Sequence, residues 1–349
     1  MPRVARRGDR GTKGLIEPLA ASHENCSDGQ TTAKVGDVYL CDKHSSPAGS
    51  PHRIKNGCQF FKIDDKPVAM QYASLSSCGC RIIEGSDIHY CCPHLDAKAK
   101  RLAEREMLIE EVREAIASGR IAPRDAHAAR HHADALERLN RDVRFAEMSV
   151  AVYQSPDAPA HLSTGFGNAP EGMIRLTDAE FRELMPEPLG DAGLVWDDND
   201  AGFHADLYYD ELSGSYTIAY RGTEPELNDA VTDHDQAHGL ETKQYNQAMD
   251  IGSVINEMRT SDPATDIDLR ATGHSLGGGL ASAGGTVGGI PYITFNAAGL
   301  HPATVARYTD GKLGNEDAAP LGRAYNTDHD PLTLAQTWGG LYVQTRPAR

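Results

Sequence analysis

The segment that most constrains this chain is Gly273-His274-Ser275-Leu276-Gly277. An apolar stretch at 267–272 precedes it, and a run of small residues at 277–283 follows it. Any Cβ at the two glycine positions would collide with packed elements, so the pattern predicts a serine on a sharp turn between a strand and a helix. A helix that begins just after the serine favours negative charge at its N-terminus. We therefore expect Ser275 to be a nucleophile and the N–H of Leu276 to be an oxyanion donor.

A second donor is expected from a loop after an earlier strand, because an acyl-transfer site needs two donors at the oxyanion. The stretch 219–224, Ala-Tyr-Arg-Gly-Thr-Glu, ends such a strand and places Thr223 for this role. Strand-like segments at 206–209 and 216–220 surround a turn at Gly214, and a helical segment at 244–258 and a buried strand at 290–295 follow. This alternation predicts a mostly parallel sheet with helices on its faces.

Three motifs in this half resemble the class 3 (fungal-type) lipase family over about residues 145–343. They are Arg-Gly-Thr-Glu at 221–224, Gly-His-Ser-Leu-Gly-Gly at 273–278 and Ile-Thr-Phe-Asn-Ala-Ala-Gly at 293–299. The resemblance implies an α/β-hydrolase fold and a carboxylic ester hydrolase of the triacylglycerol lipase or phospholipase A type, with no cofactor required for hydrolysis. It also implies Thr223 in the oxyanion hole and an acid within 326–332, where we choose Asp330 over Asp328 because Asp330 directly precedes Pro331-Leu332.

The sequence departs from that family at the triad histidine. In the family this histidine follows the acid, yet no histidine follows His329. A serine without a nearby base is a poor nucleophile. Three explanations stay open: a chain shortened at its C-terminus, which we favour, a histidine from elsewhere, or an inactive domain. His301 is the best internal candidate, and His234 and His238 lie in the expected lid loop.

Charge and cysteines divide the chain into two parts. The formal net charge of −16 argues against a general nucleic-acid binder. Residues 1–150 carry 23 basic and 21 acidic side chains, whereas residues 151–349 carry 11 and 29. All seven cysteines lie in the first 92 residues, and an odd number excludes complete intramolecular pairing. We expect two units with different surfaces, and the mixed Cys/His spacing of the first is as typical of a metal site as of disulfides.

Residues 1–92 are dense in turn residues and short apolar runs, which indicates β structure. Gly8-Asp9 is echoed by Gly36-Asp37, and together with 66–69 and 77–79 these stretches resemble the PAAR-repeat family. That resemblance implies a small cone that forms the zinc-bearing tip of the type VI secretion spike. A structural zinc would suit a unit with so small a core. The expected ligands are Cys41 and His44, spaced C-x₂-H, with His52 and Cys78 to complete the set.

Residues 93–150 have helical periodicity and are expected to form a hairpin that links the two parts. Leu102, Ile109, Val112 and Ile116 share one stripe, and Ser118-Gly119-Arg120 with Pro123 breaks the run. A histidine group at 127, 131 and 132 is expected to be solvated rather than metal-binding. The predicted domains are therefore a PAAR-like cone at 1–92, a helical linker at 93–150 and an α/β-hydrolase at 151–349.

The two resemblances together imply a type VI secretion lipase effector, a toxin that attacks membrane phospholipids. Residues 2–9 are basic and polar, so we expect no cleaved secretory signal, and no stretch is long and apolar enough for a membrane span. The expected partners are the spike trimer and an immunity protein, and the site of action is the periplasm or membrane of a target cell. The alternatives are a structural spike-tip protein with a truncated or inactive hydrolase domain, and an esterase for soluble substrates.

Overall fold

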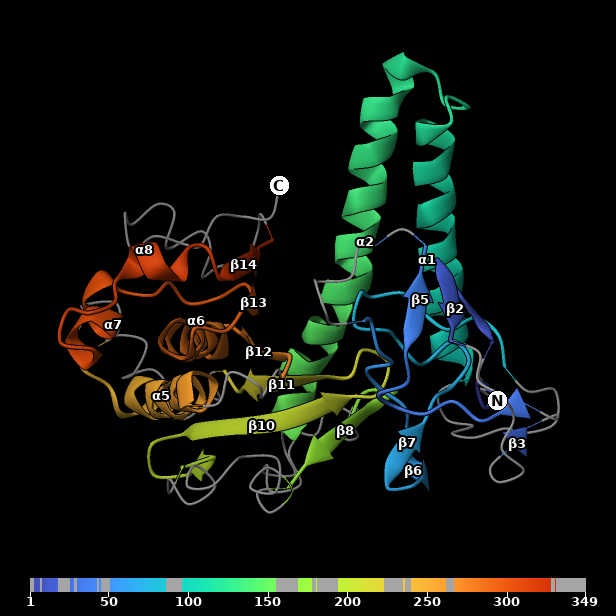
Figure 1. The fold of residues 1–349 in the computed structure, drawn as a ribbon. Coiled ribbons are helices and arrows are strands. Elements are labelled where there is room, and N and C mark those ends of the chain that lie inside the picture. Colours follow the sequence, from blue (N-terminus) through green and yellow to red (C-terminus); the bar gives the residue numbers. More distant parts are fainter. Residues whose placement is uncertain are drawn as a thin grey trace. The chain divides into compact units, whose positions relative to one another are not determined.

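The computed structural model describes residues 3–6, 8–17, 26, 27, 30–42, 44, 51–85, 96–154, 169–177, 180, 194–222, 235, 240–261, 267–327 and 330. The chain divides into two compact units (Figure 1). The first comprises Met1–Arg141, Glu171–Met173 and Asp210–Gly214, and the second comprises Asp142–Pro170, Ile174–Tyr209 and Ser215–Arg349. The domain boundaries expected at residues 92 and 150 stay predictions. Of the helices in the described ranges, none has the length and apolar character needed to span a bilayer.

The first unit contains short antiparallel strands, as the dense turn residues predict. β1 (Arg10–Gly11), β2 (Gly14–Ile16) and β5 (Tyr39–Cys41) form a sheet in the order β1-β2-β5. Two further pairs are β3 (Cys26–Ser27) with β4 (Gln30–Thr31) and β6 (Cys58–Ile63) with β7 (Lys66–Val68). Cys58 is disulfide-bonded. These strands are only two to six residues long, so side-chain and backbone cross-links must hold this part of the unit together.

Three alanines join these strands around one axis. The N–H of Ala5 donates to Ala69 O (2.8 Å), that of Ala69 to Ala33 O (2.9 Å), and that of Ala33 to Ala5 O (2.9 Å). All three side chains are fully buried. A closed cycle of three equivalent bonds means that three chain segments surround one axis with pseudo-threefold symmetry.

Each segment repeats the same internal contact. Three residues downstream of each alanine, a residue with positive φ donates its backbone N–H to the carbonyl of a buried isoleucine, in the pairs Gly8–Ile16, Gly36–Ile54 and Tyr72–Ile82. Asp9 and Asp37 each accept the N–H of the residue three positions earlier. The repetition seen in the sequence is thus structural, and its third copy lies at 69–82.

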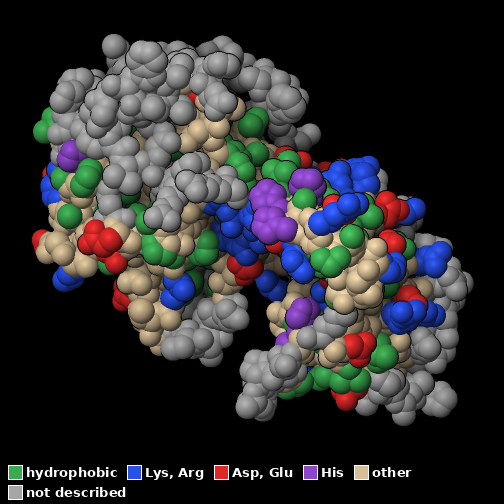
Figure 2. Space-filling view, turned by 90° about the horizontal axis from the view of Figure 1, so that it is seen from above, with side chains coloured by type: hydrophobic (Ala, Val, Ile, Leu, Met, Phe, Trp, Pro, Cys, Tyr) green, Lys and Arg blue, Asp and Glu red, His purple; other side chains and the backbone are tan. Residues whose placement is uncertain are grey.

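Two long helices follow in the chain: the first lies within the first unit, and the second continues past Arg141 into the second unit. α1 (Asp96–Ala117) and α2 (Pro123–Ala151) form the predicted hairpin, joined by ion pairs of Arg113 to Asp134 (2.8 Å) and Glu137 (2.7 Å). Leu102 and Ile109 of the predicted stripe are buried. The histidine group at 127, 131 and 132 is exposed, and Figure 2 shows histidine side chains beside Lys and Arg side chains on the surface seen from above the hairpin.

The second unit is built on a mixed, mostly parallel sheet in the order β14-β13-β12-β11-β10-β8, with β9 paired to β10. β11 (Ser215–Tyr220), β12 (Leu269–His274), β13 (Tyr292–Phe295) and β14 (Gly322–Tyr325) run parallel. β9 (Asp197–Asp198) is antiparallel to β10 (Phe203–Asp210). A turn at 211–214 joins β10 to β11 in the chain. β8 (Met173–Leu176) is at the end of the sheet opposite to β14. The α/β architecture expected from the alternating pattern is therefore confirmed.

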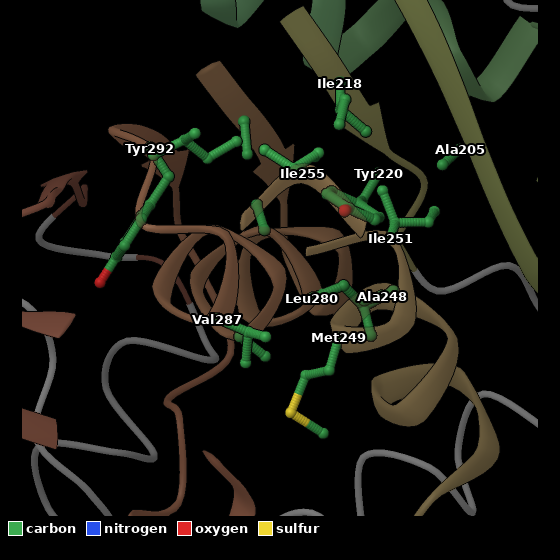
Figure 3. Packing of buried hydrophobic residues seen from close by; sticks show 14 of the residues in the cluster. Ala205, Ile218, Tyr220, Ala248, Met249, Ile251, Ile255, Leu280, Val287 and Tyr292 are labelled. Atoms are coloured by element: carbon green, nitrogen blue, oxygen red, sulfur yellow. The ribbon is translucent and has the colours of Figure 1, made fainter. Parts of the chain in front are cut away.

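Helices flank this sheet as predicted. α5 (Lys243–Ser261) and α6 (Leu276–Gly288) pack together closely, because a side chain at Gly252 or Gly284 would overlap the facing backbone. Figure 3 shows the apolar core that they share with the sheet, where Ile251, Leu280 and Tyr220 meet. The remaining helices are short: η2 (Val152–Gln154), α7 (Pro302–Tyr308) and α8 (Asn315–Ala318). α6 is buried along its whole length, so the core fixes the point where β12 ends and α6 begins.

Candidate active site

Ser275 lies on the sharp turn that the motif predicts. β12 ends at His274 and α6 begins at Leu276, and Ser275 between them has φ 57° and ψ −128°. Positive φ is unfavourable for a residue with a Cβ, and such strain persists only where the surroundings impose it. Here they do, because Ser275 N donates to Phe295 O (3.1 Å) and Ser275 O accepts from Ala298 N (2.9 Å). The strained turn presents the serine at the carboxyl end of the parallel strands.

The two glycines of the motif are required by packing. A Cβ at Gly273 would overlap the backbone of Gly277, and a Cβ at Gly277 would overlap the carbonyl oxygen of Tyr220. The second contact shows that the start of α6 lies directly against the end of β11. The segment that leads to the predicted oxyanion donor therefore borders the serine turn.

The predicted oxyanion donors can be placed in part. Leu276 is the first residue of α6, so its N–H is among the groups at the helix N-terminus that have no partner within the helix. Its side chain is buried in the core. Thr223 lies outside the described residues, but Gly222 directly before it borders His274 O, the carbonyl of the residue preceding Ser275. This arrangement suits stabilisation of an anion at the serine.

Asp330 is brought close to the serine turn. Burial lowers the pKa of His274, and the negative charge of Asp330 opposes that change, which places the carboxylate within electrostatic range of the imidazole. Asn296, which follows β13, accepts the backbone N–H of Thr327 (2.8 Å) and so holds the segment that leads to Asp330. Asn296 itself has φ 43° and was not expected as a site residue.

His301, the internal candidate for the triad base, lies at the start of α7 and stays a prediction in that role. Its Nδ1 accepts the N–H of Ala303 (3.0 Å) and caps the N-terminus of α7. A neutral imidazole that accepts at Nδ1 carries its proton on Nε2, so Nε2 has no lone pair to accept a proton from Ser275. Among the residues that the structure describes, no histidine is hydrogen-bonded to Ser275, and His234 and His238 lie outside them. The base is therefore not assigned.

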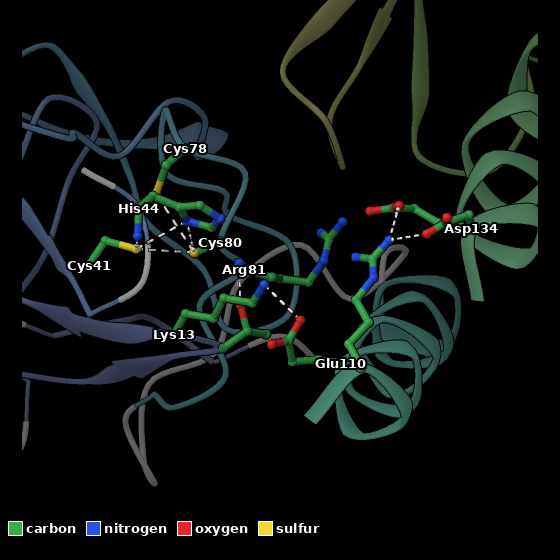
Figure 4. A network of polar contacts seen from close by, with 11 residues as sticks. Lys13, Cys41, His44, Cys78, Cys80, Arg81, Glu110 and Asp134 are labelled. Atoms are coloured by element: carbon green, nitrogen blue, oxygen red, sulfur yellow. Dashed lines mark hydrogen bonds and ion pairs between the residues drawn. The ribbon is translucent and has the colours of Figure 1, made fainter. Parts of the chain in front are cut away.

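The first unit holds a separate cluster of four ligand-type side chains. Cys41, His44, Cys78 and Cys80 have their ligand atoms within 4.8 Å of one another (Figure 4). The Sγ atoms of Cys78 and Cys80 are 3.6 Å apart, and His44 Nδ1 is 3.1 Å from Cys41 Sγ. Tetrahedral zinc with bonds of about 2.3 Å to sulfur separates its sulfur ligands by about 3.8 Å. The donor set and its spacing therefore fit zinc, which would staple the loops that carry these residues.

One predicted ligand is replaced in this cluster. His52 lies beside it, but its Nε2 is 3.2 Å from the carbonyl oxygen of His44 and its Nδ1 faces the Ser77 hydroxyl at 3.5 Å. Cys80 occupies the fourth position instead. Burial and the neighbouring Cys78 raise the pKa of the Cys80 thiol to about 12, so a bound cation would be needed to hold it as a thiolate.

The sheet, the strained serine turn and the flanking helices define the class of the second unit as an α/β hydrolase-type domain. Residues 144–346 match the family model described as "Phospholipase-like: Tle-like phospholipase domain", and the chain belongs to this family. The extracellular phospholipase A1 of Serratia liquefaciens is 33% identical over 174 residues, which are 49% of this chain and 50% of that protein. The chain thus spans about half the length of this curated relative. Of the activity that the class 3 lipase resemblance implied, these matches support the coarser part, a phospholipase-type hydrolase domain.

Proposed function

We propose that this protein is a serine phospholipase that cleaves carboxylic esters of membrane phospholipids through an acyl-Ser275 intermediate. The observation that carries the proposal is the strained turn of Ser275 between β12 and α6, within the segment that matches a phospholipase family. The name of the Serratia relative, a phospholipase A1, supports the substrate class.

The geometry supports the following sequence of steps. Ser275 Oγ attacks the ester carbonyl while a base accepts its proton, and the N–H groups of Leu276 and Thr223 bind the oxyanion. The lysophospholipid leaves as the alcohol after protonation, and water then hydrolyses the acyl-serine to free fatty acid. Asp330 is the proposed acid that orients the base. The strand-end turn and the helix N-terminus supply positioning and charge stabilisation, which is usually the largest share of such catalysis.

We further propose that the first unit delivers this enzyme as the tip of a type VI secretion spike. The closed cycle of Ala5, Ala33 and Ala69 gives the unit pseudo-threefold symmetry, which suits a flat contact with a trimeric spike. The zinc-compatible cluster suits a small cone that needs a staple. The enzyme would then act in the periplasm or at the membrane of a target cell, and the producer would hold an immunity protein against it.

A second candidate function has one observation in its favour. The Ser275 hydroxyl has no hydrogen bond to a histidine of the described residues, as expected if the hydrolase domain is an inactive passenger on a structural spike tip. A third candidate, an esterase for soluble substrates, keeps Ser275 but needs no lipid surface.

The deciding experiment compares the 349-residue protein with its Ser275→Ala variant on phospholipid vesicles, with fatty acid and lysophospholipid measured by mass spectrometry. Release by the parent and a loss of at least about a thousandfold in the variant is the expected result. Equal, background release by two folded proteins would contradict the proposal and favour the structural role. Equal rates on monomeric and vesicle substrate would favour the esterase.

A further inference from the structure

Tyr153 lies where two backbone segments of the second unit meet. It belongs to η2, directly after α2, and its hydroxyl is 3.3 Å from His274 Nδ1 and 3.4 Å from His274 O. The two rings are tilted by 60° with centroids 6.3 Å apart. The phenol therefore contacts the residue directly before Ser275 through both its side chain and its backbone.

The same hydroxyl also packs against Gly222, at the end of the segment that follows β11. A Cβ at Gly222 would overlap Tyr153 OH and would lie 2.5 Å from His274 O. No side chain can stand at this position, so the tyrosine oxygen packs on bare backbone. Gly222 precedes Thr223 and His274 precedes Ser275 and Leu276. One hydroxyl thus touches both segments that carry the proposed oxyanion donors.

The element that presents Tyr153 is fixed to the sheet. Thr272 Oγ1 of β12 donates to Phe145 O in α2 (3.3 Å). At the end of α2, Arg175 of β8 donates to Ala151 O (3.3 Å) and to the Tyr208 hydroxyl (3.1 Å). The phenol is half-buried, and the backbone that carries it is hydrogen-bonded to the sheet. Its oxygen can therefore fix the distance between the His274 and Gly222 segments.

We propose that Tyr153 is a positioning residue that sets the spacing between the Ser275 turn and the segment at Arg221-Gly222, directly before Thr223 in the sequence. This inference rests on the proposed function, because the spacing matters for an oxyanion held between the two segments. Donors in such a site must be held within about 0.5 Å of their productive positions, and an error of 1 Å lowers the rate by about a hundredfold. Tyr153 acts through His274 and Gly222 and does not itself touch the reacting ester.

The test is Tyr153→Phe, which removes only the oxygen. The matched control is Tyr216→Phe, a partly buried tyrosine of β11 whose ring packs against Tyr209 at a tilt of 46° and whose hydroxyl makes no hydrogen bond to a described residue. For Tyr153→Phe we expect kcat to fall by about tenfold or more, KM to change less than about twofold, and Tm to stay within about 3 °C of the parent. Tyr216→Phe should leave kcat unchanged.

Hydrogen exchange at the amides of Gly222 and Leu276 gives a readout that does not depend on turnover. We expect at least about threefold faster exchange there in Tyr153→Phe, with no change in Tyr216→Phe. Unchanged exchange together with unchanged kcat would overturn the inference, as would an equal fall of kcat in both variants. If parent and Ser275→Ala release product equally, the proposed function fails, and the exchange rates alone decide whether Tyr153 holds the two segments.

Discussion

Gly277→Ala is the sharpest perturbation of the serine turn. The added Cβ would overlap Tyr220 O and lie 2.8 Å from the Arg221 carbonyl carbon and 2.9 Å from its oxygen. All three are backbone atoms, so no flexible side chain can move aside. A carbon and an oxygen normally approach no closer than about 3.3 Å, so the end of β11 must shift by about 1 Å relative to α6.

The shift has different consequences for rate and for stability. A displacement of about 1 Å between the two oxyanion segments should lower kcat by about a hundredfold. Overpacking should lower the free energy of unfolding by about 1–3 kcal/mol, offset by about 1 kcal/mol from the higher helix propensity of alanine. The activity loss should therefore greatly exceed the stability loss.

The assay measures fatty acid release from vesicles and urea unfolding for the same samples. Gly288→Ala is the matched control, because it makes the same change at the other end of α6, where the nearest atom to the new Cβ is 3.2 Å away. The control should keep the parent's kcat. Activity of Gly277→Ala within about threefold of the parent would refute the argument that the backbone contact positions the site.

Three further predictions concern other residues. Cys80→Ser should lower both the Tm and the amount of zinc bound per chain, as measured by inductively coupled plasma mass spectrometry. His52→Ala should leave the bound zinc unchanged. An equal loss of zinc in both variants would indicate that His52 is a ligand. His301→Asn should keep activity within about threefold, since asparagine also caps helices, whereas a fall of about a thousandfold or more would make His301 the base. The pKa of His274 is lowered by burial, so its neutral form adds stability that is complete above the unfolded value of 6.5 and is lost as pH falls through the folded pKa. Asp330→Asn should lower the pKa of His274 further in an NMR titration, and a rise would contradict their proximity.

The parts of the fold that the sequence predicts are those set by local chemistry. The glycines around Ser275 and the apolar strand before it specify the turn, because the packing demand acts within a few residues. The repeats at Gly8 and Gly36 were visible because both copies use glycine at positive φ. Their third copy has Tyr72 at φ 62°, so its sequence signal was lost.

The parts that the sequence did not predict depend on distant contacts. Tyr153 is 121 positions from His274 in the sequence, and no pattern in either segment predicts that the two side chains are in contact. The sequence analysis predicts His52 as the fourth ligand, whereas the cluster contains Cys80, which the Cys78-Gly79-Cys80 spacing brings to the same loop as Cys78. His301 caps α7, and the sequence signal for that cap is Pro302 directly after it, because proline is common at the first position of a helix.

The positive φ of Ser275 has a consequence for how this protein can change over evolutionary time. Only glycine would relieve the backbone strain at this position, and glycine has no hydroxyl. Strain of this kind destabilises a fold by about 1–3 kcal/mol, so replacement of the serine by glycine would raise the free energy of unfolding while removing the proposed nucleophile. Homologues that are no longer selected for hydrolysis should therefore lose this serine early. Where the serine is present, as here, the fold is less stable than it would be with glycine at this position.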